Sequence, residues 1–232
     1  MGQVKIVTDT TCDLPQDIVK QYDIRLVPTI VTIGDKVYRD TLELSAEQLY
    51  ETLKTSSERP VVAPPGRKDF SDVYTKLSQE TDTVISIHIS DHLGQTYNLA
   101  ANMARFATGA AKKQGNNLDI TVVNSLTTSI GLGIIVVEAA RLAEAGKGKD
   151  EILANINPII ENMKSLFMVD DVSYLEKSGR AGKAAAVIGN LLNLKPIFSI
   201  EGGETDVKGR PRGAGAFDKM IDLMGEAVPF GS

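Results

Sequence analysis

Val4-Lys5-Ile6-Val7, followed directly by Thr8-Asp9-Thr10-Thr11-Cys12-Asp13, is the stretch that decides the fold class. It reads as a short apolar strand that runs into a loop of hydroxyl and acidic side chains, and a helix is expected from Pro15 onward. The same order of strand, polar loop and apolar helix returns at residues 83–89 and again at residues 120–123. Strands that alternate with helices predict a parallel sheet covered on both faces, so we expect an α/β protein.

The three polar loops follow their strands directly, at residues 8–13, 90–96 and 124–128. Because the carboxyl ends of parallel strands meet at one edge of the sheet, we expect these loops to form the polar rim of a single ligand cleft. The helix over residues 130–143 is apolar on nearly all sides, which predicts burial between layers. Such helices belong to a packed interior or line a tunnel, and the pattern leaves both interpretations open.

The composition excludes several classes of protein. The chain has 232 residues, 42% of them apolar, which is enough for one large or two small domains. A net charge of −5 argues against a nucleic-acid partner held by a basic face. The single cysteine, Cys12, excludes a disulfide scaffold. No apolar run approaches the roughly 18 residues of a membrane span, and we therefore expect a cytoplasmic protein without one.

The remaining segments predict a second domain. Residues 25–40 read as a hairpin and residues 59–66 as an irregular loop, and a later helix is expected to bend near Pro158. A strand over 166–169, an Ala-rich helix and a second hairpin follow. We place the boundary near residue 163, which gives domains over residues 1–163 and 164–232.

Familiar catalytic and metal motifs are incomplete in this sequence. Gly179-Arg-Ala-Gly-Lys183 has two residues between its glycines, whereas a phosphate loop has four and a Ser or Thr after the lysine. His88 and His92 straddle a strand end and a loop, so packing and hydrogen bonds are expected of them rather than metal binding. Cys12 lies beside Asp9 and Asp13, whose carboxylates disfavour a thiolate nucleophile. We expect neither a metal nor a cofactor.

Seven strings resemble the DegV family of bacterial fatty-acid-binding proteins, in family order and over essentially the whole chain. They are Thr8-Asp-Thr-Thr-Cys-Asp-Leu-Pro15, Val37-Tyr-Arg-Asp40, Ile85-Ser-Ile-His-Ile-Ser90, Gly131-Leu-Gly133, Val169-Asp-Asp-Val-Ser-Tyr-Leu175, Ser178-Gly-Arg-Ala-Gly-Lys-Ala184 and Leu194-Lys-Pro196. The resemblance implies a DegV-like two-domain fold, with an N-terminal Rossmann-like parallel sheet and a second α/β domain. It also implies one long-chain fatty acid in the cleft between them. In well-understood members a fatty acid kinase phosphorylates the carboxylate of that acid.

The chain departs from the family where the carboxylate is held. The family reads Thr-Thr-Ser-Gln-Pro-Ser at residues 61–66 and Leu-Ser-Gly-Thr at residues 93–96. Its carboxylate-binding Thr and Ser correspond here to Val62 and Gly94, a neighbouring Ser corresponds to Ala63, and only Thr96 keeps its hydroxyl. The family also continues for several dozen residues beyond this chain, so we expect either a naturally short form or a truncation.

The resemblance and the polar loops together predict a non-enzymatic lipid carrier. The candidate ligand-binding residues are Thr10, Thr11, Val62, Ala63, Ser90, Gly94, Gln95, Thr96 and Arg180. The lost hydroxyls favour a less acidic head group, or one held by Gln95 and backbone amides. The basic cluster at Arg210 and Arg212 is either a solvated turn or a docking site for a fatty acid kinase.

Two other interpretations stay open at this point. One is an enzyme of the phosphotransferase or hydrolase type that uses Asp9 and Asp13 as base or metal ligands. The other is a degenerate interaction module that binds no ligand. The lipid's chain length, its saturation and the oligomeric state of the protein do not follow from the sequence.

Overall fold

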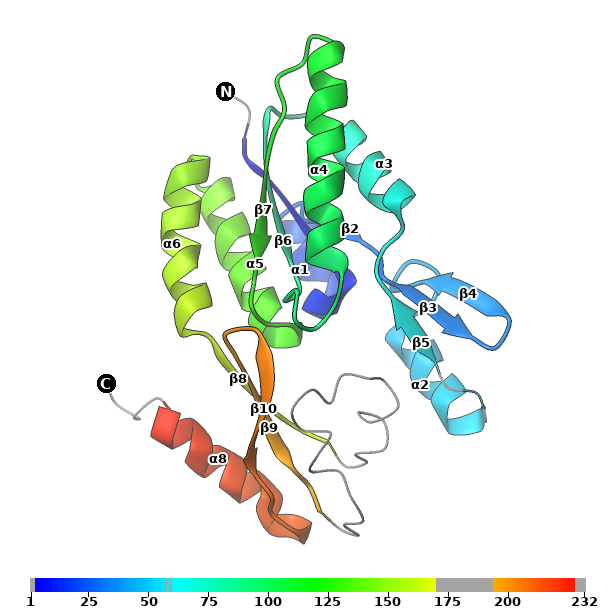
Figure 1. Cartoon of the computed structure of the whole chain (residues 1–232), viewed down its shortest axis with the longest axis vertical. Helices are drawn as coiled ribbons and strands as arrows, with labels where there is room; N and C mark the ends of the chain where they lie inside the picture. The colour runs from blue at the N-terminus through cyan, green and yellow to red at the C-terminus, as the bar shows by residue number, and fades with distance from the viewer. Residues whose placement is uncertain (1–2, 57, 59, 170–193, 228–232) are drawn as a thin grey trace.

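A four-stranded parallel sheet forms the centre of the molecule. The computed structural model describes residues 3–56, 58, 60–169 and 194–227. The sheet contains β1 (Lys5–Asp9), β2 (Arg25–Val27), β6 (Thr83–His88) and β7 (Asp119–Asn124) in the order β2-β1-β6-β7, and every pairing is parallel. Figure 1 shows it in the upper half of the molecule. The α/β prediction for this part of the chain is confirmed.

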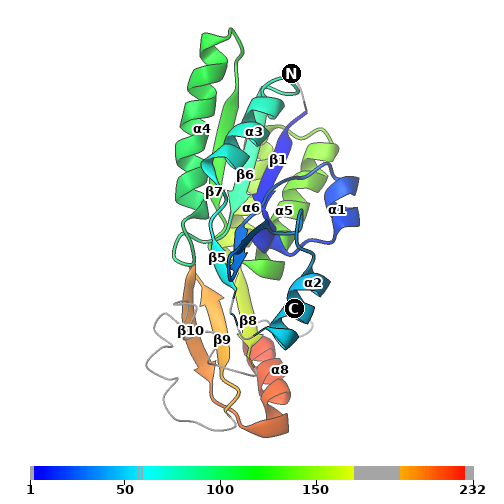
Figure 2. The same cartoon turned by 90° about the vertical axis from the view of Figure 1, so that its right-hand side faces the viewer.

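Helices cover both faces of this sheet (Figure 2). The helices α1 (Gln16–Gln21), α5 (Ser129–Glu144) and α6 (Lys149–Asn162) pack on one face. On the other face lie α3 (Arg67–Leu77) and α4 (Thr96–Lys113). The strands supply apolar side chains to both cores, since Ile6 enters the first and its neighbour Val7 the second. This alternation is what a doubly covered parallel sheet requires.

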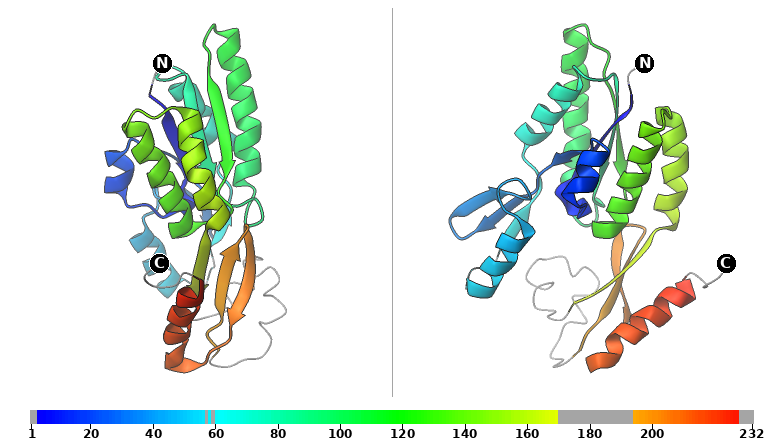
Figure 3. Two further views of the ribbon diagram at one scale, coloured as in Figure 1. Left: turned by 90° about the vertical axis from the view of Figure 1, so that its left-hand side faces the viewer. Right: turned by 180° about the vertical axis from the view of Figure 1, so that it is seen from behind.

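A second, antiparallel sheet follows α6, and we call it the C-terminal sheet. It contains β8 (Lys164–Met168), β9 (Ile197–Glu201) and β10 (Glu204–Gly209) in the order β10-β9-β8, with α8 (Ala216–Ala227) packed against it. It lies below the parallel sheet in Figures 1 and 3. The strand expected at 166–169 thus begins two residues earlier, at Lys164. The expected Ala-rich helix and the loop at 178–180 lie outside the described residues.

A small lobe projects from one side of the parallel sheet (Figure 1). It contains β3 (Ile30–Ile33), β4 (Lys36–Arg39), β5 (Val61–Ala63) and α2 (Ala46–Thr55). The three strands are antiparallel in the order β4-β3-β5. The predicted hairpin over 25–40 was therefore too long, because β2 ends at Val27 in the parallel sheet and only β3 and β4 form the hairpin. The predicted irregular loop at 59–66 contains β5.

Two further expectations about helices change. The helix over residues 130–143 is not buried on nearly all sides. On the first turns of α5, Ile130 is 73% exposed and Ile134 is 51% exposed. The helix expected to bend near Pro158 runs as one element from Lys149 to Asn162. Within the described ranges, no helix combines the length and apolar character that crossing a membrane would require.

Candidate functional site

A cavity of about 750 Å³ lies between the parallel sheet and the C-terminal sheet. Its size falls in the range of small-molecule binding sites, roughly 300–1,000 Å³. Ten apolar side chains form most of its wall: Val62, Ile89, Leu93, Ile130, Ile134, Met163, Leu166, Phe167, Ile200 and Met224. Gly131 and six polar residues complete it: Thr11, Thr128, Ser129, Lys164, Ser165 and Thr205. The exposed isoleucines of α5 are therefore cavity wall, which gives their exposure a physical reason.

Glycines allow the first turn of α5 to reach this position. A Cβ atom on Gly131 would lie 2.6 Å from Thr127 Oγ1 and 2.8 Å from Ser165 Oγ. Those two hydroxyls are hydrogen-bonded to each other at 3.1 Å and join the loop before α5 to strand β8. Two residues later, a Cβ atom on Gly133 would lie 2.8 Å from the backbone oxygen of Cys12. Side chains at either position would push α5 away from its neighbours.

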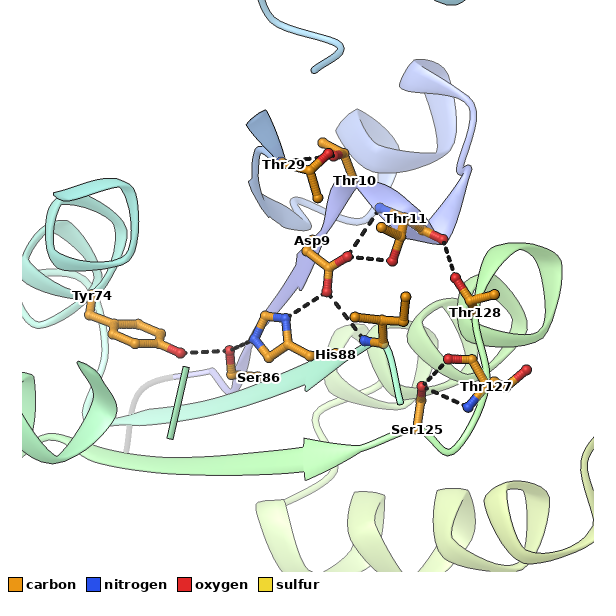
Figure 4. A network of polar contacts seen from close by, with 11 residues as sticks. Asp9, Thr10, Thr11, Thr29, Tyr74, Ser86, His88, Ser125, Thr127 and Thr128 are labelled. Carbon is orange, nitrogen blue, oxygen red and sulfur yellow. Dashed lines mark hydrogen bonds and ion pairs between the residues drawn. The ribbon is translucent and has the colours of Figure 1, made fainter. Parts of the chain in front are cut away.

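The hydroxyl groups beside the start of α5 already donate to acceptors within the protein. Thr11 Oγ1 donates to Asp9 Oδ1 at 2.5 Å, and Ser129 Oγ donates to Asp13 Oδ2 at 2.6 Å. Thr128 Oγ1 donates to the backbone oxygen of Thr11 over 3.5 Å (Figure 4). Each hydroxyl has one proton, so these three residues offer a ligand mainly lone pairs. The side chains of this part of the wall are therefore poor donors for a carboxylate, whereas the first backbone N–H groups of α5 have no side-chain cap.

Behind Thr11 lies a buried chain of polar groups (Figure 4). Asp9 Oδ2 is 2.9 Å from His88 Nδ1, His88 Nε2 is 2.7 Å from Ser86 Oγ, and Ser86 Oγ is 2.8 Å from the Tyr74 hydroxyl. All four side chains are fully buried. Burial acts to raise the pKa of Asp9, but His88, Thr11 and the N–H of Ile89 outweigh it, and the pKa lies below the ordinary value.

This geometry bears on the enzyme interpretation. Asp9 lies at the end of β1 with both carboxylate oxygens hydrogen-bonded, so it is no exposed general base. The pKa of Asp13 is raised by burial and by the nearby carboxylates of Asp40 and Asp9, against the hydrogen bond from Ser129. Burial above all raises the pKa of the Cys12 thiol to about 12. Among the described residues, no group of three or more His, Cys, Asp or Glu side chains could hold a metal ion.

The predicted ligand-binding residues divide into two groups in the structure. Thr11 and Val62 lie in the cavity wall. The others that the structure describes lie outside that wall: Thr10, Ala63, Ser90, Gly94, Gln95 and Thr96. Arg180 lies outside the described residues. Arg210 and Arg212 are exposed where the chain leaves β10, also outside the wall.

Ser90 and Thr10 have structural partners instead. Ser90 Oγ donates to the backbone oxygen of Gly203 at 3.0 Å and thereby ties the loop after β6 to the β9–β10 turn. Gly203 has a φ of 89°, and a Cβ atom there would lie 2.6 Å from Ser90 Oγ. The hydroxyl of Thr10 is 2.9 Å from that of Thr29, at the start of the small lobe. Both residues thus fix segments that surround the cavity.

The sequence argument missed Ser129 and Lys164. Ser129 follows the third polar loop directly, so extending that loop by one residue would have included it. Lys164 is the first residue of β8 and lies next to the predicted domain boundary. A charged residue at the entry of a new domain, beside a cleft expected between domains, was the available signal.

Comparison with known proteins agrees with this architecture. A family model described as "Uncharacterised protein, DegV family" matches residues 3–229. A DegV domain-containing protein of Clostridium acetobutylicum is 34% identical over 213 residues, 92% of this chain and 74% of the relative. The chain belongs to the DegV family.

Solved structures show the same two-domain fold. One, described as fatty acid binding of a DegV family protein from Thermus thermophilus, has 30% identity and a TM-score of 0.86. It covers 98% of this chain and 79% of the relative. DegV of Bacillus subtilis, described as a fatty acid binding protein, has 27% identity and a TM-score of 0.82, with coverage of 97% and 78%. The predicted DegV-like architecture is confirmed.

Proposed function

We propose that this chain binds one long-chain fatty acid in the cavity between its two sheets and carries it in the cytoplasm without transforming it. The observation that carries the proposal is the cavity of about 750 Å³ with its ten apolar side chains. The descriptions of the Thermus and Bacillus relatives as fatty-acid-binding proteins support the same ligand class.

The apolar wall is sufficient to bind such a ligand. Burial of a tail of about fifteen methylenes stabilises the complex by about 12 kcal/mol before the cost of association is subtracted. Each hydrogen bond to the carboxylate adds about 1.5–3 kcal/mol. The family's missing hydroxyls at Val62 and Gly94 therefore weaken the head-group contacts without removing the main source of affinity.

Substitution of Ile134 by Asp is expected to weaken the binding of palmitic acid at least tenfold. Ile134 lies in the cavity wall and is half exposed, so the new carboxylate is hydrated in the free protein but faces the alkyl chain in the complex. The loss corresponds to roughly 1.5 kcal/mol or more, about the value of one buried aliphatic side chain. Titration with palmitic acid measures the affinity.

Phe106→Asp is the matched control. Phe106 is also an exposed apolar helical residue, at 69%, but it lies on α4 outside the cavity wall. Its substitution is expected to leave the affinity within twofold. Mass spectrometry of the denatured, purified protein should also find a fatty acid that came with it from the cell. An empty wild-type protein that takes up no added palmitic acid would contradict the proposed function.

The finer part of the proposal is that the loaded protein presents its acid to a fatty acid kinase, with Arg210 and Arg212 as the docking residues. Neighbouring Lys208 is held by Glu201 at 3.1 Å and by Asp206 at 3.6 Å. Arg210 and Arg212 make no ion pair with any described residue, so their charges are available to an acidic partner surface.

The docking proposal predicts a defect in phosphorylation alone. The double variant Arg210→Glu and Arg212→Glu should bind palmitic acid as the wild type does, while kinase-catalysed formation of the acyl phosphate falls at least tenfold. Lys36→Glu combined with Lys76→Glu makes the same charge change elsewhere and should leave the rate unchanged. Equal loss in both double variants would assign the effect to net charge and overturn the docking site.

A further inference from the structure

One charged side chain lies in the wall of the cavity as far as the structure describes it, and that residue is Lys164. It is the first residue of β8, next to Met163 and Ser165, which also line the cavity. The other described wall residues are apolar or carry neutral polar groups. A cation in an otherwise apolar and neutral wall adds charge selectivity to whatever binds there.

No salt bridge joins Lys164 to a described residue, but the residue acts on a nearby carboxylate. The pKa of Glu201 is lowered mainly by its hydrogen bond with Lys208, and the charge of Lys164 lowers it further. In the register of β8 and β9 it is opposite Glu201. The carboxylate of Glu201, however, contacts the ammonium group of Lys208 at 3.1 Å. Because the direct salt bridge of Glu201 is with a lysine from β10, the exposed ammonium group of Lys164 is free of a close contact with this carboxylate and can approach an anion.

The neighbouring hydroxyls do not compete with Lys164 for this role. Those of Thr11, Thr128 and Ser129 donate their protons to Asp9, to a backbone oxygen and to Asp13, respectively. An anionic oxygen needs donors, and lone pairs of hydroxyl oxygens repel it. The hydroxyl of Thr205 has no partner among the described residues, but it is neutral. Lys164 is thus the described wall residue best able to attract a carboxylate.

We infer that Lys164 binds the carboxylate of the lipid and makes the cavity selective for single-chain fatty acids over their neutral esters and alcohols. This role rests on the proposed function and assigns its head-group specificity. It also compensates for the hydroxyls that the family has at positions 62 and 94 and that Val62 and Gly94 lack. A charge-assisted contact from Lys164 on β8 replaces their neutral hydrogen bonds.

The test compares palmitic acid with its methyl ester at pH 8, where the free acid is ionised. The wild type is expected to prefer the acid by roughly tenfold or more. Lys164→Gln should bring this ratio close to one by weakening acid binding, with ester binding unchanged. Lys164→Arg should keep the preference, because it keeps the charge. Lys76→Gln, on the exposed face of α3, controls for the change in net charge.

Each other outcome separates this inference from the proposed function. If the wild type binds acid and ester equally, or if Lys164→Gln keeps the full preference for the acid, the role of Lys164 is wrong and lipid binding stands. Equal weakening of acid and ester in Lys164→Gln would assign the residue to packing along the tail, which also overturns the inference. If the wild type binds neither probe, the proposed function and the inference fail together.

Discussion

Substitution of Asp9 by Ala is expected to lower the free energy of unfolding by about 3 kcal/mol, because it removes a buried carboxylate that accepts several hydrogen bonds and leaves their buried donors without a partner. Asp9 is fully buried: its Oδ1 accepts a hydrogen bond from Thr11, and its Oδ2 accepts one from the N–H of Ile89 and contacts His88. Removing the carboxylate leaves His88 without its partner in the core. Urea unfolding followed by circular dichroism measures the loss. Glu161→Ala, an exposed change on α6, should stay within about 0.5 kcal/mol.

The same residue makes the stability depend on pH, and Asp9→Asn isolates this effect. The folded-state pKa of Asp9 lies below its ordinary value of 3.8, so unfolding takes up a proton as the pH falls through this region. The stabilisation is present above pH 3.8 and is lost as the pH falls toward the folded-state pKa. The difference in unfolding free energy between wild type and Asp9→Asn should therefore be full at pH 7 and shrink below about pH 4. A difference that does not change with pH would contradict this.

Substitution of Gly133 by Ala is expected to destabilise the protein by about 2 kcal/mol. Helix propensity alone would favour alanine over glycine, so the expected loss has the opposite sign. Its Cβ atom would lie 2.8 Å from the backbone oxygen of Cys12 and 3.1 Å from Leu14 Cδ2, so α5 must move. Movement of α5 also displaces Ile130 and Ile134 in the cavity wall, and the affinity for palmitic acid should fall with the stability. Thermal unfolding and lipid titration of one preparation test both effects.

Gly109 in α4 provides the control with the opposite sign. It lies in an exposed part of a long helix, and a Cβ atom there would have no other atom within 4 Å. Gly109→Ala should therefore raise the unfolding free energy by about 0.5–1 kcal/mol through helix propensity alone. If both alanine variants shift the stability in the same direction, close contact between α5 and the loop after β1 is not what requires Gly133.

Three strands of the parallel sheet, β1, β6 and β7, and the helices that follow them could be predicted because their patterns are local. Strands buried on both faces are short apolar runs, and each was followed by a recognisable polar loop and a helix. Residues 25–33 also read as a continuous strand, but Pro28 and Thr29 separate β2 from β3, which belong to different sheets. Which sheet a short strand joins depends on partners far away in the chain, so the local sequence pattern does not predict it.

The position of the cavity at the carboxyl ends of the parallel strands could be predicted, but most of the residues that form its wall could not. Loops at the carboxyl ends of the strands do lie near the cavity, and Thr11 and Val62 are in its wall. Ser90 is in the expected loop, yet its hydroxyl faces the backbone of Gly203 because the β9–β10 turn packs there. Lys164 was missed, since its place in the cavity wall depends on the pairing of β8 with β9, which lies far along the chain. Such choices among partners arise only when the sheets assemble.

The contact between Asp9 and His88 spans 79 residues of chain, and this has a consequence during synthesis of the protein. At roughly 5–20 residues per second, a ribosome needs about 4–16 s to extend the chain from Asp9 to His88. Throughout that time β1 has no β6 beside it, and the aspartate keeps its hydration shell. One edge of β1 can pair with β2 early in synthesis, but its other edge cannot pair until the second strand–loop unit has been made.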